Sequence, residues 1–256
     1  MRRESEKIRQ YYRVLLSRWG PQNWWPAQSR FEVIVGAFLT QNTNWSNVER
    51  AIASLRRARR LSVKGIRDVS LPELEQLVRS SGYFRQKAQR LKNFVEFLDS
   101  GYGGSLDRMF AQPTEKLRVE LLALNGVGPE TADSILLYAG SHPVFVVDAY
   151  TRRILERHGI INAKTDYEEI RSLVEKAVTG ADPTALEVSN CGADPRHPRS
   201  RMSSRQCSRL AKHYDEFHAL IVRAGNEYCR KTPKCNGCPL QKYLPHGVAV
   251  GIGNKS

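Results

Sequence analysis

Apolar residues recur at helical spacing along most of the chain. Two stretches within residues 31–55 carry this pattern, with a polar break between them. The first stretch consists of Ile34, Ala37, Phe38 and Gln41, and the second of Val48, Ala51, Ile52 and Leu55. Because residues three and four apart share one face of an α-helix, the pattern predicts two amphipathic helices.

A capping pattern and the same periodicity indicate further helices downstream. Ser70 precedes Pro72 and Glu73, which is typical of a helix start because the hydroxyl and the carboxylate can each accept a backbone N–H group. Apolar positions within residues 84–99 share one face, and residues 114–124 form another helical stretch.

The segment LNGVG, residues 124–128, opens the next helix, which runs through Ala139. After it comes the apolar run VFVV, residues 144–147, which ends at Asp148. Since the sequence offers no second alternating run to pair with it, this run is predicted to be a buried, extended lead-in rather than a strand. A helix then begins at Asp148 and is closed at Gly159, because glycine readily adopts the conformation that ends helices.

Residues 179–208 interrupt the helical pattern. They are rich in Pro, Ser and Arg and lack periodicity, so they are predicted to form a long loop or a disordered insertion. The helical pattern resumes in residues 214–229, and the tail after Leu244 is expected to be loose. Together these elements predict an all-α protein.

Composition narrows the class of partner. The 256 residues include 40 Lys and Arg against 26 Asp and Glu, which leaves a net charge of +14, and the pI is near 9.8. Such a surface suits a polyanion, so nucleic acid is the leading partner; the alternative is a basic protein that is merely soluble. No apolar stretch reaches the ~20 residues of a membrane helix, and the charged N-terminus has no apolar leader region behind it. We therefore expect a soluble, intracellular protein.

The glycine-containing segment has the composition of a phosphate-binding turn. Helix N-termini carry unpaired N–H groups, and glycines let an anion approach the backbone without a Cβ in the way. By itself a Gly-x-Gly between two helices is just as often a plain turn. The spacing is not that of a Walker loop, and the sequence has no strand before the turn, as a dinucleotide fold requires.

The segment LNGVGPETADSILLYAGSHPVFVVDAYTRRILERHG resembles the helix-hairpin-helix and Gly/Pro-Asp signature of the endonuclease III superfamily of DNA glycosylases. The segments WGPQNWWPAQSRFEVIVGAFLTQNTNWSNVERAI, GYFRQKAQRLKNF and EFHALIVRAGNEYC are also similar to this superfamily, and particularly to its 3-methyladenine glycosylase III branch. The main gap is residues 179–213. The resemblance implies a two-lobed all-α fold with an active site between the lobes. One lobe would span residues 30–140 with the hairpin, and the other residues 1–29 and 141–256 with a C-terminal cysteine loop.

The resemblance implies that Asp148 is catalytic. A glycosidic bond breaks through an oxocarbenium-like sugar, which a neighbouring carboxylate stabilises. Asp148 is equally suited to cap the following helix, and the two roles are compatible. Bifunctional members carry a lysine 18 residues before this aspartate, where this chain has Glu130. A carboxylate forms no imine, so the departure predicts a monofunctional enzyme.

The resemblance also assigns the residues that contact DNA and the damaged base. Gln41 and the turn of Gly82 and Tyr83 would fill the space that a flipped base leaves. The hairpin would bind phosphate through Asn125, Gly126, Val127 and Gly128, and the base pocket would be formed by Trp24, Trp25, Pro26 and Trp45. Aromatic faces attract cationic bases, which favours alkylated purines; alternatively, the tryptophans are core residues.

Five cysteines form an odd set, which fits a metal or cluster site in a reducing compartment better than disulfides. Cys229, Cys235 and Cys238 are similar to the cysteine loop of the superfamily's iron–sulfur members, but the fourth position is Leu244. Because [4Fe–4S] clusters take four thiolates, another group would complete the set, or the cluster is labile, or the site is degenerate. The candidate fourth ligands are Cys191, Cys207, His218 and His246. Zinc on three Cys and one His is the alternative metal, and a cluster would direct Arg230, Lys231 and Lys234 toward phosphates.

These observations favour a monofunctional DNA glycosylase that excises alkylated, 3-methyladenine-like purines from double-stranded DNA in base excision repair. One alternative is a bifunctional glycosylase/lyase for oxidised pyrimidines, with Lys87 as the nucleophile. The other is a lesion-binding protein that kept the fold and lost catalysis. The protein is expected to be a monomer in the cytoplasm, associated with the nucleoid in a prokaryote.

Overall fold

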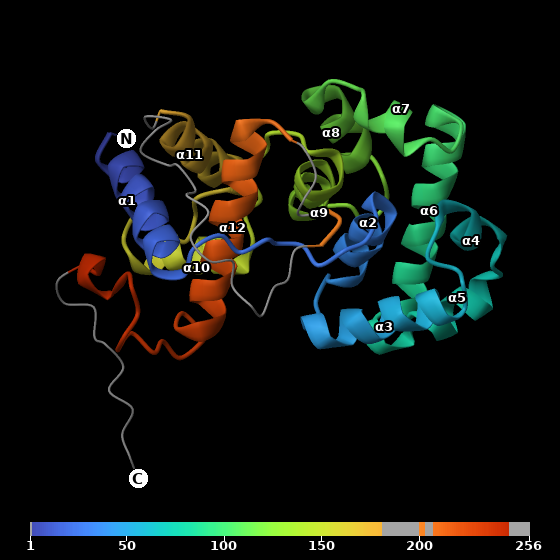
Figure 1. Cartoon of the computed structure of the whole chain (residues 1–256), viewed down its shortest axis with the longest axis horizontal. Coiled ribbons are helices and arrows are strands. Elements are labelled where there is room, and N and C mark those ends of the chain that lie inside the picture. The colour runs from blue at the N-terminus through green and yellow to red at the C-terminus, as the bar shows by residue number, and fades with distance from the viewer. Residues whose placement is uncertain (1, 181–199, 203–206, 246–256) are drawn as a thin grey trace, which may run out of the picture. The chain divides into compact units, whose positions relative to one another are not determined.

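The computed structural model describes residues 2–180, 200–202 and 207–245, and these residues form helices and connecting segments without a strand (Figure 1). They belong to two compact units. The central unit comprises residues 27–142 and 200–202, and the terminal unit comprises residues 2–26, 143–180 and 207–245. Among the described helices, none combines the length and the apolar character needed to cross a bilayer.

The central unit is assembled around α2 (Arg30–Leu39). Every residue of this helix after Arg30 is buried, and all of these are apolar except Glu32, whose carboxylate pairs with Arg56. It packs against α3, α6, α9 and the π-helix η2. The other elements of this unit are α3 (Trp45–Arg57), α4 (Val63–Asp68), α5 (Leu71–Leu77), η1 (Arg79–Ser81), α6 (Phe84–Tyr102), α7 (Leu106–Phe110), α8 (Thr114–Leu122), α9 (Pro129–Ser134) and η2 (Ile135–Gly140).

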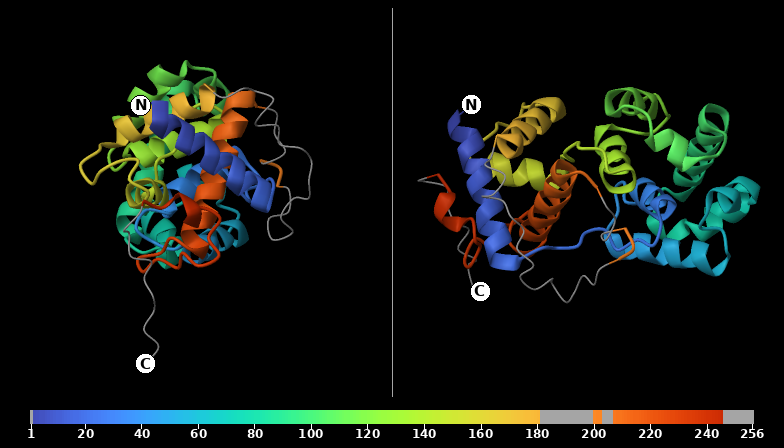
Figure 2. Two further views of the ribbon diagram at one scale, coloured as in Figure 1. Left: turned by 90° about the vertical axis from the view of Figure 1, so that its left-hand side faces the viewer. Right: turned by 45° about the horizontal axis from the view of Figure 1, so that its top comes forward.

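The terminal unit joins both ends of the described chain. It contains α1 (Arg2–Trp19), α10 (Ala149–Arg157), α11 (Tyr167–Thr179), α12 (Arg209–Glu227) and the short 3₁₀ helix η4 (Gln241–Tyr243). Helix α12 contacts α1, α10 and α11, and Figure 2 shows α1 and α11 beside it. Its long buried face makes α12 the centre of this unit.

The predicted helices are present. At the start of α5 the Ser70 hydroxyl accepts the Glu73 N–H group, but the Glu73 carboxylate lies 3.6 Å from Arg60, so only the hydroxyl half of the predicted capping pattern is formed. Residues 144–147 are buried and form no strand, as predicted. Gly159 adopts a positive φ of 64° after α10. The helix through Ala139 ends in a π-helical turn, which periodicity does not reveal.

Four helices, α1, α4, α7 and α11, were not predicted from the apolar periodicity. Helix α1 is rich in charge, yet it buries Ile8, Tyr11, Tyr12 and Leu15, which are spaced for one helical face. Helix α11 begins with a capping box of Asp166 and Glu169. Both signals are local, so the sequence does contain the information for these two helices. Most of the predicted loop, residues 181–199 and 203–206, lies outside the described residues, as does the tail from residue 246.

Candidate functional site

The predicted phosphate-binding hairpin joins α8 to α9 in the central unit. Gly126 has φ +78°, a conformation that favours glycine, and a Cβ there would displace the flexible end of the Arg90 side chain. Gly128 is exposed, and a Cβ there would have no neighbour within 4 Å. Asn125 is exposed and Val127 is buried. The buried valine anchors the turn, in which the backbone at Gly128 is open to solvent and Gly126 lies against Arg90.

A buried ion pair holds the two hairpin helices together. Arg118 of α8 donates to both carboxylate oxygens of Asp133 in α9, at 2.6 and 3.2 Å. The Asp133 side chain is fully buried. The sequence did not indicate this pair, since neither residue belongs to a recognisable motif.

The structure brings Gln41 directly against the hairpin. Its Nε2 atom donates to the Gly126 carbonyl at 3.0 Å and to the Thr131 hydroxyl at 2.9 Å. Its Oε1 atom accepts a hydrogen bond from Arg90 of α6. Gln41 and the hairpin are therefore one hydrogen-bonded assembly, which the sequence spacing alone does not indicate.

The neighbouring turn presents Tyr83 to solvent. Gly82 and Tyr83 both have positive φ, and the tyrosine side chain is 67% exposed. An exposed tyrosine in the left-handed region is uncommon, so the turn is a constrained position for an aromatic side chain. The role of both residues in filling the space left by a flipped base stays a prediction.

Lys87 is a structural residue of the central unit. It is buried, and its Nζ atom donates to the carbonyls of Leu39 at 2.9 Å and Ser81 at 2.6 Å. Burial, followed by the charge of Arg90, lowers the pKa of Lys87 to about 8. The amine ties the end of α2 to η1.

In the terminal unit, Asp148 is the N-cap of α10. Its Oδ1 atom accepts the Thr151 N–H group at 2.7 Å, and its Oδ2 atom lies 3.6 Å from Nε2 of His218 in α12. Both side chains are largely buried. Burial lowers the pKa of His218, and the Asp148 charge partly opposes this shift, so the imidazole is neutral at pH 7. The N-terminus of α10 thus holds one carboxylate oxygen by a hydrogen bond, and the other oxygen faces the His218 imidazole at 3.6 Å, beyond hydrogen-bond distance.

The predicted base-pocket residues belong to different units. Trp24, Trp25 and Pro26 follow α1 in the terminal unit, where Trp25 is buried and Pro26 is exposed. Trp45 begins α3 in the central unit, and its Nε1 atom donates to Glu49 at 3.0 Å. That these four residues line one base pocket stays a prediction.

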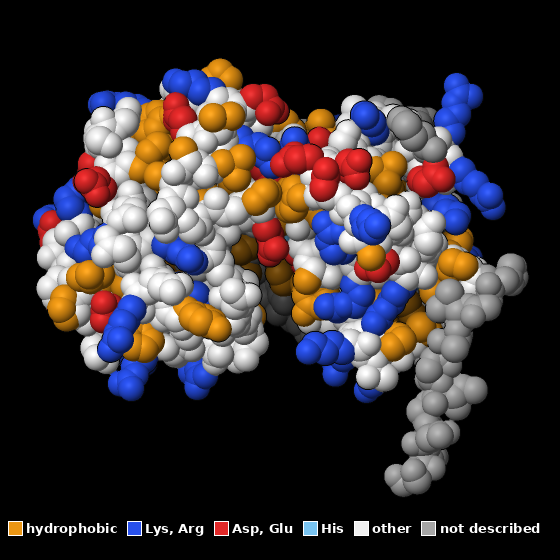
Figure 3. All heavy atoms as spheres, turned by 180° about the vertical axis from the view of Figure 1, so that it is seen from behind, with side chains coloured by type: hydrophobic (Ala, Val, Ile, Leu, Met, Phe, Trp, Pro, Cys, Tyr) orange, Lys and Arg blue, Asp and Glu red, His pale blue; other side chains and the backbone are white. Residues whose placement is uncertain are grey.

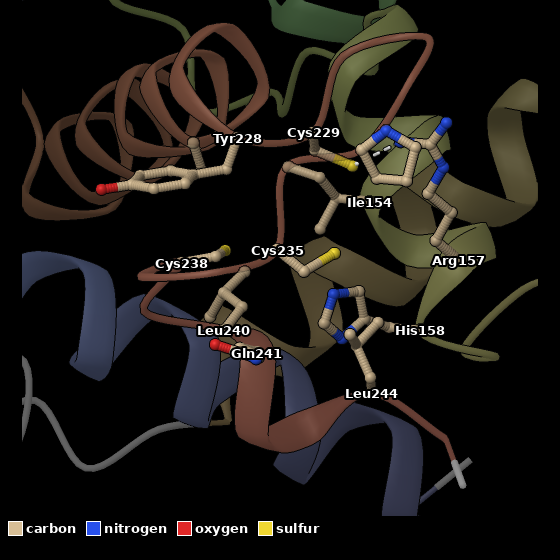
Figure 4. Close-up of a pocket in the computed structure, with 12 residues that line it drawn as sticks. Ile154, Arg157, His158, Tyr228, Cys229, Cys235, Cys238, Leu240, Gln241 and Leu244 are labelled. Atoms are coloured by element: carbon tan, nitrogen blue, oxygen red, sulfur yellow. Dashed lines mark hydrogen bonds between the residues drawn. The ribbon is translucent and has the colours of Figure 1, made fainter. Parts of the chain in front are cut away.

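The three C-terminal cysteines line one small cavity in the terminal unit (Figure 4). The cavity volume is about 20 Å³. Burial and the neighbouring thiols raise the pKa of Cys235 and Cys238. The remaining wall includes His158 and Leu244, so the position of the expected fourth ligand contributes an apolar side chain.

The described residues do not complete a ligand set for a four-thiolate cluster. His218 lies against Asp148, not in this cavity, and Cys207 is not part of the cavity wall. Cys191 and His246 lie outside the described residues. Within the described ranges, no group of three or more His, Cys, Asp or Glu side chains is arranged to hold a metal ion. The donor set therefore falls short of what such a cluster requires.

Two arginines of α10 hold the backbone of the cysteine loop. Arg153 donates to the Cys229 carbonyl at 2.8 Å. Arg157 donates to the carbonyls of Arg230 at 2.7 Å and Lys231 at 2.8 Å, and to the Cys229 sulfur at 3.2 Å. The loop thus has protein contacts that fix it to the helix capped by Asp148.

Comparisons with known proteins give a consistent picture. Residues 35–179 match the family described as HhH-GPD superfamily base excision DNA repair protein. The chain is 42% identical to protein MJ1434 of Methanocaldococcus jannaschii, whose name places it among DNA repair glycosylases, over 93% of this chain and 96% of that protein. It is 30% identical to endonuclease III of Thermotoga maritima over 56% of this chain and 63% of that protein.

Solved structures share the fold. The H. pylori 3-methyladenine DNA glycosylase MagIII, solved with 1,N6-ethenoadenine, is 29% identical with a TM-score of 0.71, over 88% of this chain and 97% of that one. A non-covalent endonuclease III–DNA complex has a TM-score of 0.69 at 21% identity, over 94% of each chain, and shows likeness of fold alone. The predicted resemblance and the all-helical glycosylase fold are confirmed.

Proposed function

Because the chain belongs to the HhH-GPD superfamily of base excision DNA repair proteins and is a DNA glycosylase, we propose that it excises alkylated purines from double-stranded DNA by hydrolysis alone. It would act as a monomer and leave an abasic site. The observation that carries this proposal is the placement of Asp148, whose carboxylate is held by a hydrogen bond at the α10 N-terminus and lies beside His218.

The proposed role of Asp148 follows from the charge that develops on the sugar. As the base departs, the sugar becomes oxocarbenium-like, and a pre-oriented carboxylate stabilises that charge without reorganising. An alkylated purine is already cationic, so it leaves without strong acid assistance. The carboxylate would also orient the attacking water.

A lyase mechanism would need a lysine amine at one of two candidate positions, Glu130 or Lys87, and the residues found there support hydrolysis instead. An imine requires a free lysine amine at the sugar. Glu130 stands at the position where bifunctional members carry the lysine. Lys87, the other candidate, is buried and donates to two backbone carbonyls. Neither residue is suited to attack an abasic site.

The proposed substrate class is supported by the tryptophans and by one relative. Aromatic faces bind cationic bases more tightly than neutral ones. The H. pylori enzyme is a 3-methyladenine DNA glycosylase and was solved with 1,N6-ethenoadenine. Release of bases from a mixed alkylated and oxidised substrate, followed by chromatography, tests this choice; release of oxidised pyrimidines alone contradicts it.

Asp148→Asn tests the catalytic assignment. Asparagine caps helices as well as aspartate, so α10 should remain intact while the charge is lost. We expect single-turnover excision from methylated DNA to fall by about 10²–10³-fold, with DNA affinity and melting temperature unchanged. The matched control is Asp166→Asn at the N-cap of α11, which should leave excision unaffected. Equal activity of wild type and Asp148→Asn would contradict the proposal.

Borohydride trapping on abasic DNA tests the lyase alternative. We expect no covalent adduct with the wild-type protein. An adduct that disappears in Lys87→Ala would favour the bifunctional enzyme.

A [4Fe–4S] cluster would be held by Cys229, Cys235 and Cys238, and it would need a fourth ligand that the described residues do not identify. When bound, it would stabilise the cysteine loop structurally. Iron and acid-labile sulfide analysis of protein purified without oxygen tests this occupancy, and protein free of both would contradict it.

A further inference from the structure

The guanidinium of Arg90 lies between two features of the proposed DNA-binding surface. On one side it donates to the Oε1 atom of Gln41. On the other side it covers the bare Cα of Gly126, where an added Cβ would overlap the arginine. Arg90 therefore contacts the residue proposed to fill the vacated base position and the turn proposed to bind phosphate.

Arg90 completes the hydrogen bonding of the Gln41 side chain. The amide nitrogen of Gln41 uses its two hydrogens on Gly126 and Thr131, at 3.0 and 2.9 Å. The amide oxygen accepts from Arg90, and such charge-assisted bonds are stronger than neutral ones. Two segments of the central unit, the hairpin and α6, thus hold one flexible side chain, and α6 supplies the charged group of the three.

We propose that Arg90 is a positioning residue, which locks Gln41 to the hairpin before DNA binds. Ordering a free glutamine side chain costs conformational entropy, and a side chain that is already held avoids this cost when it enters the duplex. The inference rests on the proposed function. Beyond that function, we infer that base flipping depends on Arg90, which acts through Gln41.

A purely ionic role for Arg90 would have different consequences. An arginine that only attracts phosphate weakens DNA binding when it is removed, irrespective of Gln41. Arg85 lies on the same helix, and its side chain is 81% exposed. Arg85→Ala therefore removes the same charge from α6 without touching Gln41 or the hairpin.

The test compares Arg90→Ala, Arg90→Lys, Arg85→Ala, Gln41→Ala and the Gln41→Ala/Arg90→Ala double variant. Fluorescence of 2-aminopurine next to an alkylated base reports flipping, and single-turnover excision and duplex affinity are measured separately. We expect Arg90→Ala to slow flipping and excision by about tenfold. Its loss of affinity should match that of Arg85→Ala, and Arg90→Lys should recover part of the rate.

The double variant gives the decisive comparison. If Arg90 acts through Gln41, the double variant should be no slower than Gln41→Ala alone, because the coupled interaction is already lost. The inference would be overturned if the rate losses of the two single variants multiply in the double variant. It would also be overturned if Arg85→Ala slows flipping and excision as much as Arg90→Ala does. Melting temperatures identify any variant that fails to fold. If Arg90→Ala is unfolded, the same comparison is made with Arg90→Lys, alone and combined with Gln41→Ala.

The two proposals fail in distinguishable ways. A wild-type protein that neither flips nor excises any alkylated base contradicts the proposed function. A wild-type protein that does both, with Arg90→Ala equally fast, contradicts only the role of Arg90.

Discussion

Glu216 of α12 anchors the segment that carries Trp24 and Trp25. Its Oε1 atom accepts the Gln22 N–H group at 2.6 Å. Gln22 in turn accepts from Arg223 at 3.1 Å, and that arginine lies over the Trp19 ring at 4.6 Å. Burial raises the pKa of Glu216 to about 7, and burial likewise raises the pKa of the adjacent Asp215. The folded state therefore holds the Glu216 proton more tightly than the unfolded chain does.

This difference predicts a loss of stability with rising pH. Glu216 contributes its full stabilisation below the ordinary glutamate pKa of 4.5 and loses it as the pH rises through about 7. Glu216→Gln can still accept the Gln22 N–H group but does not titrate. We expect the free energy of unfolding of the variant, relative to wild type, to increase by about 3 kcal/mol between pH 4.5 and pH 8.

Urea denaturation across this pH range measures the difference. Glu115→Gln, at an exposed position of α8, is the control and should show no such trend. A constant difference between Glu216→Gln and wild type across the range would contradict the prediction.

At the scale of elements, the Arg118–Asp133 pair fixes α8 against α9, the two helices that the hairpin turn joins. Both charges are withdrawn from water, and two hydrogen bonds compensate them. Removing one partner deprives the other buried charge of this opposite charge, which is costly even where the intact pair adds little net stability. The hairpin geometry therefore depends on residues outside the glycine turn itself.

Asp133→Ala is expected to lower the free energy of unfolding by about 3–5 kcal/mol. The exposed Lys64–Asp68 pair of α4 provides the comparison, and Lys64→Ala should cost less than about 1 kcal/mol. Urea denaturation at pH 7 measures both. Similar small losses in the two variants would show that the buried pair is not required for stability.

At the scale of the whole molecule, the net charge of +14 governs association with DNA. On the face drawn in Figure 3, Lys and Arg side chains are present on each of the two units. The proposed DNA contacts are the hairpin in the central unit and the cysteine loop in the terminal unit. The cysteine loop carries Arg230, Lys231 and Lys234. Binding should therefore depend on the release of counterions from phosphates.

We expect the logarithm of the association constant to fall linearly with the logarithm of salt concentration, with a slope of about −3 to −6 for three to six phosphate contacts. Fluorescence anisotropy with a labelled duplex measures this slope. An undamaged duplex should show a similar slope, because the ionic contribution does not depend on sequence. A flat profile would contradict DNA as the partner.

Features that depend on neighbouring residues were predictable from the sequence. The periodicity of α2, α3 and α6 identified helices, and Ser70 and Asp148 were recognisable as residues that start them. Even the missed helices α1 and α11 carry local signals. Local spacing suffices in these cases because capping and amphipathic burial act within a few residues.

The sequence by itself thus determined the helical class, the basic character, the helix-capping carboxylate and the family motifs. Only the tertiary structure decided which distant side chains meet. His218 lies 70 residues after Asp148, Arg90 reaches both Gln41 and Gly126, and Lys87 is committed to two carbonyls. The physical reason is that such contacts depend on how helices pack, and helix packing is set by the combined burial of many side chains rather than by any local pattern.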